Sequence, residues 1–266
     1  MKIGIIGLGV VGSANKYGFE KIGHKVFVHD IKLKTNIDVI KNTEIVFLCV
    51  PTPSNKDGSC NTDIVERVIK NLHTINYDGV ICIRSSTEPG FTERAIKKFK
   101  NNKICFVPEF LRERMAKKDF TENHNLLAVG TRNKKVFNYV VKAHSNLPKK
   151  VAILKPTEAE ILKYYINVFA SLRVTFANII YEICEKFGCN YEKIKNSYVD
   201  TGRGSPKMYL SVSKKLRGYA GICLPKDTRT IINLLKKSNL KFDLIKSIEK
   251  DNQKFKKTIF KRMRFK

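Results

Sequence analysis

The stretch Gly7-Leu-Gly9-Val-Val-Gly12 directly follows an apolar run and opens a segment with the pattern of a helix. In a strand–turn–helix context the first glycine permits a tight turn, the second lets the backbone approach a phosphate, and the third allows close helix–strand packing. The N–H groups and positive dipole end of that helix would then face the phosphates. The stretch therefore predicts a βαβ unit that binds a dinucleotide, with Val10 and Val11 in the first helical turn beside the pyrophosphate.

A carboxylate at the end of the next apolar run supports the same interpretation. Asp30 closes the run 25–30 and follows Gly12 by eighteen residues. A carboxylate at this place accepts hydrogen bonds from ribose hydroxyls and repels a 2′-phosphate, so NAD is favoured over NADP. The neighbouring Lys32 and Lys34 weaken that preference. A glycine-rich turn without a ligand is the alternative.

The first half of the chain alternates short β-branched runs with amphipathic segments. Continuous apolar strands alternating with helices need cover on both faces, so the pattern predicts an α/β fold with a Rossmann-type, doubly wound parallel sheet. The predicted strands are 2–7, 25–30, 44–50, 79–84, 103–107, 125–129 and 151–154, and the predicted helices are 62–75, 92–99 and 133–144.

The pattern changes after Pro156. Thr157 and Glu160 have the spacing of a capping box, and no Gly or Pro interrupts the chain from there to Gly188. This predicts a helix of about 30 residues and roughly 45 Å, long enough to join two domains or to form the core of a dimer. A smaller, lysine-rich and mostly helical domain is expected after it. The predicted division is 1–155 for the dinucleotide-binding domain, 156–188 for the connecting helix and 189–266 for the middle domain.

The bulk composition narrows the function classes. Lys and Arg number 51 against 24 Asp and Glu, a formal charge of +27, which attracts polyanions such as nucleic acid. The lysines are spread along the chain rather than gathered in a stripe, so nucleic-acid binding is the less favoured interpretation. The seven cysteines have scattered spacing, which predicts reduced thiols and no metal site. The apolar runs are short and the N-terminus enters a strand directly, so we expect a cytoplasmic protein with no membrane span.

Five motifs occur in the order found in a known family. They are Val50-Pro-Thr-Pro53, Arg84-Ser-Ser86 with Pro89-Gly90, Pro108-Glu-Phe-Leu-Arg-Glu113, Thr157-Glu-Ala-Glu-Ile-Leu-Lys163 with Asn167, and Gly218-Tyr-Ala-Gly-Ile-Cys-Leu-Pro-Lys-Asp227. On these motifs essentially the whole chain resembles the UDP-glucose/GDP-mannose dehydrogenase family, and in detail its branch that oxidises UDP-glucose. The resemblance implies NAD-dependent oxidation of a nucleotide sugar, of the UDP-glucose to UDP-glucuronate type, in two hydride transfers.

The resemblance also implies catalytic roles. Cys223 is implied as the nucleophile that holds the aldehyde as a thiohemiacetal, later a thioester. Lys163 and Asn167 share a helix face at i and i+4 and are implied to stabilise the oxyanion, with Lys163 also taking part in removing the alcohol proton. Asp227 is implied to position or activate the hydrolytic water, near Glu113. The plain alternatives are a buried structural cysteine, a solvated lysine, a helix-capping aspartate and an exposed glutamate.

Binding contacts follow from the same resemblance. Those to NAD are the glycine turn, Asp30, Lys34, Val50, Pro51, Thr52, Ser86 and Glu113, and those to the sugar nucleotide are Glu109, Phe110, Leu111, Arg112, Glu113, Lys163, Asn167, Gly218, Tyr219 and Gly221. Ser86 is implied in water binding as well. The family has Thr at the place of Ser86 and Gly at the place of Ala220, so the water and the sugar would be held differently. The middle-domain arginine of the family corresponds to Arg203 or Lys207.

The end of the chain leaves alternatives open. Family members continue into a third α/β domain that completes the nucleotide pocket and lends an arginine, whereas this sequence ends at Lys266 in a basic segment. A non-catalytic NAD-binding remnant, or a subunit that pairs with a longer relative, is therefore the second hypothesis. A hydroxyacid dehydrogenase of the 6-phosphogluconate type shares the glycine turn and a Lys-x-x-x-Asn helix, but it has no need of Cys223. A homodimer through the long helix is expected in either case.

Overall fold

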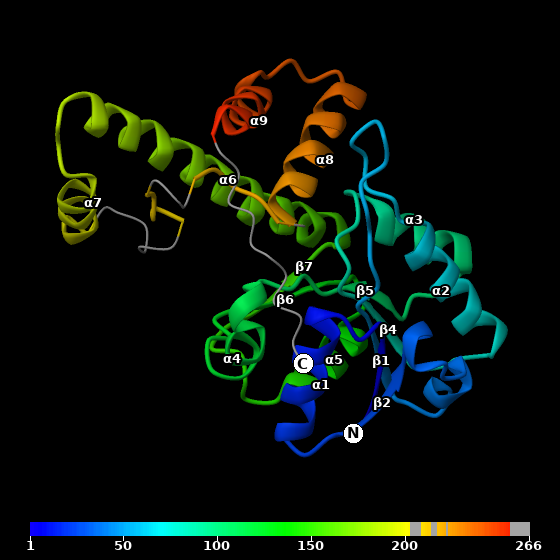
Figure 1. The fold of residues 1–266 in the computed structure, drawn as a ribbon. Coiled ribbons are helices and arrows are strands. Elements are labelled where there is room, and N and C mark those ends of the chain that lie inside the picture. Colours follow the sequence, from blue (N-terminus) through cyan, green and yellow to red (C-terminus); the bar gives the residue numbers. More distant parts are fainter. Residues whose placement is uncertain (203–208, 214–216, 222, 256–266) are drawn as a thin grey trace. The chain divides into compact units, whose positions relative to one another are not determined.

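The computed structural model describes residues 1–202, 209–213, 217–221 and 223–255. The chain divides into two compact units (Figure 1). Unit 1 comprises Met1–Pro53 and Cys60–Lys163, and unit 2 comprises Ser54–Ser59 and Tyr164–Lys266. The boundary falls inside one long helix, α6 (Pro156–Lys186). Each unit is described by itself.

Unit 1 is built on a seven-stranded sheet with the order β2-β1-β3-β4-β5-β6-β7. The strands are β1 (Lys2–Ile6), β2 (Lys25–His29), β3 (Ile45–Leu48), β4 (Val80–Ile83), β5 (Ile104–Phe106), β6 (Leu127–Gly130) and β7 (Val151–Leu154). Every residue of β3 to β6 is buried, as the continuous apolar runs require in a sheet covered on both faces. The predicted Rossmann-type architecture is confirmed.

The sheet is mostly parallel, as predicted, and one pair of strands near its edge is antiparallel. The first five strands in the sheet order pair in parallel, but β6 pairs antiparallel with β5, and β7 runs parallel to β6. Antiparallel neighbours need no crossover helix on the sheet face. The connection 107–126 instead forms η3 (Glu113–Met115) and the short helix α4 (Ala116–Thr121), which packs against the first helix of the chain.

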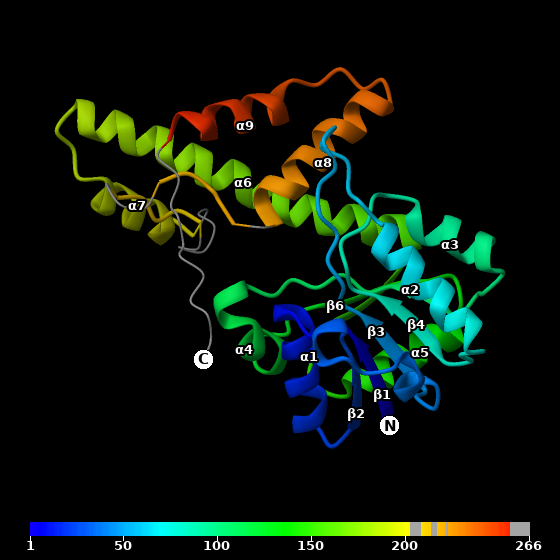
Figure 2. The same cartoon turned by 45° about the vertical axis from the view of Figure 1, so that its right-hand side comes forward.

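Helices cover both faces of this sheet (Figures 1 and 2). One core joins the sheet to α1 (Val10–Lys21), α4 and α5 (Lys134–His144). A second core, on the other face, joins it to α2 (Asp63–Thr74), α3 (Phe91–Phe99) and the start of α6. The three helices predicted in this half are therefore confirmed, each to within a residue or two at its ends.

The start of α6 differs from the predicted capping box. The helix begins at Pro156, one residue before the expected cap, and proline suits this first position because its missing N–H has no helical partner. The backbone N–H of Lys155 donates to Glu158 Oε2 at 2.8 Å. Glu160 instead turns away from its own helix, to the loop before α3. The box is thus shifted by two residues, and the second glutamate is released for another contact.

The end of α6 is the predicted glycine stop. Gly188 has φ +64°, its N–H donates to Glu185 O, and the N–H of Cys189 donates to Cys184 O. These are the two bonds of a Schellman motif. By length and composition α6 could cross a membrane. However, its buried Glu160, Lys163 and Asn178 all form hydrogen bonds within their own units, which is typical of a core helix.

Unit 2 is mostly helical. It holds the rest of α6 with α7 (Tyr191–Asp200), α8 (Cys223–Lys237) and α9 (Leu244–Lys254), and Figures 1 and 2 show α8 beside α9. A small core in this unit contains Ala177, Tyr181 and Cys184 of α6 together with Tyr191 of α7. The hydroxyl of Tyr191 donates to Leu210 O at 2.6 Å. The loop Ser54–Ser59 joins this unit because Thr230 and Asn233 of α8 donate to the carbonyls of Gly58 and Asp57.

A buried cation lies under α5 in unit 1. The guanidinium of Arg84 contacts the rings of Phe47 and Phe120 and donates to His144 Nε2 at 2.6 Å. His144 Nδ1 lies 2.8 Å from Val140 O, so the neutral ring donates there and accepts from Arg84. Burial, and then the charge of Arg84, hold the pKa of His144 well below its usual range. The same two causes lower the pKa of His124 to about 4.

These histidines predict a loss of stability in mild acid. The unfolded chain takes up a proton at each ring as the pH falls through about 6.5, whereas the folded rings stay neutral until far lower pH. The unfolded state thus binds more protons, and stability falls as the pH drops, by up to about 1.4 kcal/mol per pH unit for each histidine. Urea unfolding between about pH 7 and pH 5.5 measures this slope.

The variant His144→Gln keeps an acceptor for Arg84 but cannot titrate, so we expect its slope to be lower by about one proton equivalent. The matched control is His73→Gln, which removes an exposed histidine of α2 and should leave the slope as it is. An unchanged slope in His144→Gln would contradict the assignment.

Candidate active-site residues

The glycine turn joins β1 to α1 under tight steric limits. Gly7 has φ +91°, and a Cβ there would lie 2.7 Å from Cys49 O. A Cβ on Gly12 would lie 1.9 Å from Gly7 O. Real Cβ atoms do not approach backbone so closely, so α1 can sit this near to the strands β1 and β3 only with glycine at both positions.

Gly9 differs because nothing crowds it. It is the exposed N-cap of α1 with no side-chain cap, and a Cβ there would meet no atom within 4 Å. The first N–H groups of a helix have no intrahelical partner, and its positive end favours anions. The turn therefore offers open space and backbone donors at one point, which is the cradle that a pyrophosphate fits. Val10 and Val11 supply the first of these donors.

Asp30 is tied to the same turn. Its Oδ2 accepts from the N–H of Leu8 at 2.6 Å and its Oδ1 from the N–H of Lys32 at 2.8 Å. Partial burial acts to raise the pKa of this carboxyl, but the two backbone hydrogen bonds outweigh it and the pKa lies below its ordinary value. Asp30 is thus an ionised acceptor beside the turn, as a contact to ribose hydroxyls requires. Lys34 lies near it, exposed, with φ +51°.

The loops after β3 and β4 lie next to this turn, since these strands follow β1 in the sheet order. The hydroxyl of Ser85 donates to the carbonyls of Leu48 and Val50, at 3.2 and 2.7 Å, and so ties the two loops together. Thr52 is buried, Pro51 is exposed and Ser86 is half-buried. The predicted NAD contacts of both loops therefore belong to the carboxyl edge that carries the glycine turn.

A buried ion pair links α6 to the segment after β5. Lys163 Nζ donates to Glu109 O at 2.7 Å and to Glu109 Oε1 at 2.9 Å, and both side chains are at most one-tenth exposed. The other oxygen, Oε2, accepts from the N–H of Leu111. Two charges removed from water need such close geometry and further hydrogen bonds to offset desolvation. The sequence placed both residues in the site but did not predict their pairing.

Glu160 holds the loop that follows Ser86. Its carboxylate accepts from the N–H and the hydroxyl of Thr92, from the N–H of Gly90 at 2.5 Å and from the hydroxyl of Thr87. Burial raises the pKa of Glu160, although these hydrogen bonds act in the other direction. Sequence reasoning missed this clamp. The sequence did contain a signal for it. Thr157-Glu-Ala-Glu160 has two glutamates near the start of the helix, and a capping box needs only one of them.

The other residues of the Glu109–Glu113 segment are less enclosed. Arg112 is exposed, but its guanidinium and N–H bind the carboxylate of Asp119, with contacts of 2.5 to 2.9 Å. These bonds fasten the segment to α4. Phe110 and Leu111 are half-buried, and Glu113 is exposed at the start of η3. Arg112 therefore has a role in the fold that the sequence did not suggest.

In unit 2 the thiol of Cys223 is exposed at the first residue of α8. Asp227, one turn on, is fully buried. Asn167 Nδ2 donates to its Oδ2 at 2.5 Å, and Lys226 Nζ to its Oδ1 at 2.6 Å. Asp227 lies within the helix rather than capping it. Folding thus brings two of the predicted residues, Asn167 and Asp227, into direct contact.

Gly218, Tyr219 and Gly221 form the approach to α8. Gly218 and Gly221 have φ +38° and +87°, and the Tyr219 side chain is buried. Arg203 and Lys207, the two candidates for the middle-domain arginine, lie outside the described residues. The predicted approach of Cys223 to the dinucleotide and to Lys163 joins the two units, and it stays a prediction.

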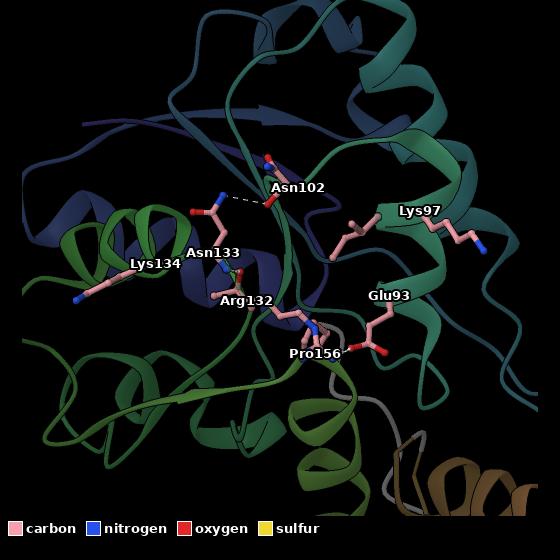
Figure 3. Close-up of a pocket in the computed structure, with 9 residues that line it drawn as sticks. Glu93, Lys97, Asn102, Arg132, Asn133, Lys134 and Pro156 are labelled. Atoms are coloured by element: carbon pink, nitrogen blue, oxygen red, sulfur yellow. Dashed lines mark hydrogen bonds and ion pairs between the residues drawn. The ribbon is translucent and has the colours of Figure 1, made fainter.

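A cavity of about 670 Å³ in unit 1 lies elsewhere. Figure 3 shows Arg132 facing Glu93, with Nη2 2.9 Å from Oε1, and Asn133 donating to Asn102 O. Asn102 precedes β5, and Arg132 follows the antiparallel β6. The cavity is therefore at the sheet edge opposite the glycine turn, and none of the predicted site residues that the structure describes lines it.

The sheet and its glycine turn define the class of dinucleotide-binding proteins with a Rossmann-type fold. Residues 31–147 match the NAD binding domain of the UDP-glucose/GDP-mannose dehydrogenase family, and residues 157–254 match its central domain. The chain belongs to the UDP-glucose/GDP-mannose dehydrogenase family.

Individual relatives agree with this assignment. The chain is 26% identical to the UDP-glucose 6-dehydrogenase TuaD of Bacillus subtilis, covering 95% of this chain and 63% of the relative. It is 29% identical to the UDP-glucose 6-dehydrogenase of Rickettsia felis, covering 82% and 50%. A UDP-glucose dehydrogenase from the archaeon Pyrobaculum islandicum has the same fold, with a TM-score of 0.84 at 22% identity, covering 95% and 68%. The chain thus matches about half to two-thirds of the length of these curated relatives.

The glycine turn predicts opposite outcomes for two alanine substitutions. In Gly12→Ala the new methyl group must displace Gly7 O, so we expect a loss of stability of at least about 2 kcal/mol. In Gly9→Ala the methyl group has space in the unliganded fold, and the loss should stay below about 1 kcal/mol. It would, however, meet the pyrophosphate, so we expect NAD affinity to fall about tenfold or more.

Urea unfolding measures the two stabilities, and calorimetric titration with NAD measures the affinity. A Gly9→Ala protein that binds NAD as tightly as the parent would show that the turn does not hold the pyrophosphate.

Proposed function

We propose that this chain oxidises the primary alcohol of a nucleotide sugar to a carboxylate, with UDP-glucose as the favoured substrate and UDP-glucuronate as the product. The family assignment supports the reaction class. The observation that carries the proposal is the arrangement on α8: an exposed thiol at Cys223, and one turn on a buried Asp227 bound to Asn167. A nucleophile and a carboxylate on one helix suit a reaction that forms an ester-like intermediate and then hydrolyses it.

The thiol accounts for the retention of the aldehyde. After the first oxidation the sulfur of Cys223 adds to the aldehyde carbon, and the new oxyanion takes up a proton to give a thiohemiacetal. Loss of a second hydride and of that proton gives a thioester. Water then adds to the carbonyl carbon, the carbon–sulfur bond breaks, and the carboxylate leaves with Cys223 restored as a thiol. NAD would supply the hydride acceptor, with one molecule consumed in each of the two oxidations.

The buried polar groups fit the proton transfers. The amine of Lys163, held by Glu109, is the proposed partner of the alcohol proton and of the oxyanion. The amide of Asn167 already donates to Asp227, and the second hydrogen of that amide is proposed to bind the oxyanion. Asp227 is the proposed acceptor of the proton from the hydrolytic water, with Ser86 and Glu113 placing that water.

Steady-state oxidation tests this proposal. Mixed with NAD and UDP-glucose, the protein should form two NADH for each UDP-glucuronate, because an alcohol loses two hydrides on the way to a carboxylate. Cys223→Ala should lower the rate by about a thousandfold or more, and Cys189→Ala, which removes the other exposed thiol, should leave it unchanged. NADH absorbance and product chromatography give the stoichiometry.

Two results would contradict the proposal. NAD binding without NADH, for UDP-glucose and for other nucleotide sugars, would favour the non-catalytic subunit. NADH formation that survives Cys223→Ala would favour a simple hydroxyacid dehydrogenase.

We further propose a homodimer through α6. In unit 2 one side of this helix exposes large apolar side chains at helical spacing, namely Tyr165, Phe169, Phe176, Ile179, Ile183 and Phe187. The rings of Tyr165 and Phe169 stack with centroids 6.2 Å apart. A contiguous exposed apolar stripe is typical of an interface. A second copy is the proposed occupant because one helical face is self-complementary about a two-fold axis.

The exposed thiol of Cys223 needs a reducing compartment, so the proposed location is the cytoplasm.

Charged substitutions on this stripe should separate the dimer. Phe169→Glu combined with Phe176→Glu would bury four carboxylates across a two-fold interface, so we expect a monomer in light scattering after size-exclusion chromatography. Phe242→Glu is the control, since it changes an exposed ring outside α6. A parent chain that is monomeric, or a double variant that keeps the parent's mass as a dimer, would contradict the proposed interface.

A further inference from the structure

The turn before Cys223 is held from one side by α9. Asn252, buried on α9, accepts the N–H of Tyr219 on Oδ1 at 2.7 Å and donates from Nδ2 to Tyr219 O at 3.0 Å. One amide side chain therefore pairs with both backbone groups of a single residue, as a neighbouring strand would. Tyr219 lies four residues before the thiol of Cys223.

Glycine at position 218 makes this contact possible. A Cβ on Gly218 would lie 2.8 Å from Asn252 Oδ1 and 3.4 Å from Phe255 Cβ. The N–H of Gly218 also points to Asn178 Oδ1 on α6, at 3.4 Å. The backbone here is thus placed between two asparagines of different helices, at a distance that only glycine permits.

Helix α9 also contacts α8, through the carboxylate of Glu249. Glu249 Oε2 accepts from the hydroxyl of Tyr219 at 2.7 Å, and its Oε1 accepts from Arg229 Nε at 3.1 Å. Arg229 lies on α8, two turns beyond Cys223. One turn of α9, from Glu249 to Asn252, therefore binds both the loop before the thiol and the helix that carries it.

We infer that Asn252 is a positioning residue for Cys223. Its amide holds the backbone of the turn from Gly218 to Gly221, and this keeps Cys223 in the first helical turn of α8. The inference rests on the proposed function for its catalytic consequence, but the geometry it assigns can be tested without turnover. A thiol at a helix N-terminus faces the N–H groups and the positive end of the helix dipole, which favour its reactive anionic form. If the turn loosens, the first turn of α8 frays and this advantage is lost.

Alkylation measures the position of the thiol directly. Cys223 and Cys189 are both exposed, so iodoacetamide should modify both, and peptide mass spectrometry gives the ratio of their rates in one sample. Cys189 follows α6 and serves as the internal reference. In Asn252→Ala we expect the Cys223 to Cys189 ratio to fall at least threefold. Gln253→Ala, which removes an exposed amide from the next position of α9, should leave the ratio unchanged.

A graded variant guards against simple unfolding. Asn252→Gln keeps both the donor and the acceptor on a side chain one methylene longer, so its ratio should lie between those of the parent and Asn252→Ala. Hydrogen exchange should show the Tyr219 amide exchanging about tenfold faster in Asn252→Ala, with α6 amides unchanged. A ratio in Asn252→Ala that matches the Gln253→Ala control, or that rises, would overturn the inference.

Kinetics then separate this inference from the proposed function. With NAD and UDP-glucose, Asn252→Ala should lower kcat at least tenfold and leave the Kd for NAD unchanged, because the glycine turn lies in unit 1. A loss of kcat and of NAD affinity together would indicate general misfolding and would overturn the positioning role. If the parent forms no NADH with any nucleotide sugar, the proposed function fails, while the alkylation ratio still decides the role of Asn252.

Discussion

Two charged side chains, Glu160 and Lys163, are buried in the first turns of α6. Each needs hydrogen-bond or charge partners from other parts of unit 1. A buried charge is costly unless hydrogen bonds or an opposite charge compensate it. Glu160 therefore requires the donors of Gly90 and Thr92, and Lys163 requires the carboxylate of Glu109. These partners lie at the start of α3, which follows β4, and on the segment after β5. The first turns of α6, which belong to unit 1, are thus anchored to the edge of the sheet where the dinucleotide turn lies.

Much of this fold could be predicted because its signals are local. Three glycines at fixed spacing define a turn that admits no Cβ at two of them, and the apolar runs define buried strands. The direction of β6 and β7 could not be predicted, because an apolar run reads the same in either direction and partner strands decide it. The capping box was misplaced by two residues for a similar reason. Two glutamates stood in range of the cap, and only tertiary contacts show which of them turns away.

The predicted site residues show the same difference between local signals, which the sequence contains, and long-range contacts, which it does not. The motifs named candidate residues, but the sequence did not show which of them contact one another across distant segments. The pairing of Lys163 with Glu109 spans 54 positions and that of Asn167 with Asp227 spans 60. Residues outside every quoted motif also support the site. Asn252 lies in a lysine-rich segment that reads as a solvated helix, and only the fold shows that its amide faces the backbone of Tyr219.

Stability alone does not account for the polar groups of unit 2. Asp227 is fully buried with Lys226 and Asn167 around it, at a position where an apolar side chain of similar size would avoid the cost of desolvation. The thiol of Cys223, by contrast, is exposed at a helix end where it adds nothing to a core. A chain that only had to fold and bind a dinucleotide would need neither arrangement. We propose that both arrangements serve a reaction that forms a bond to sulfur and then directs water to the resulting thioester.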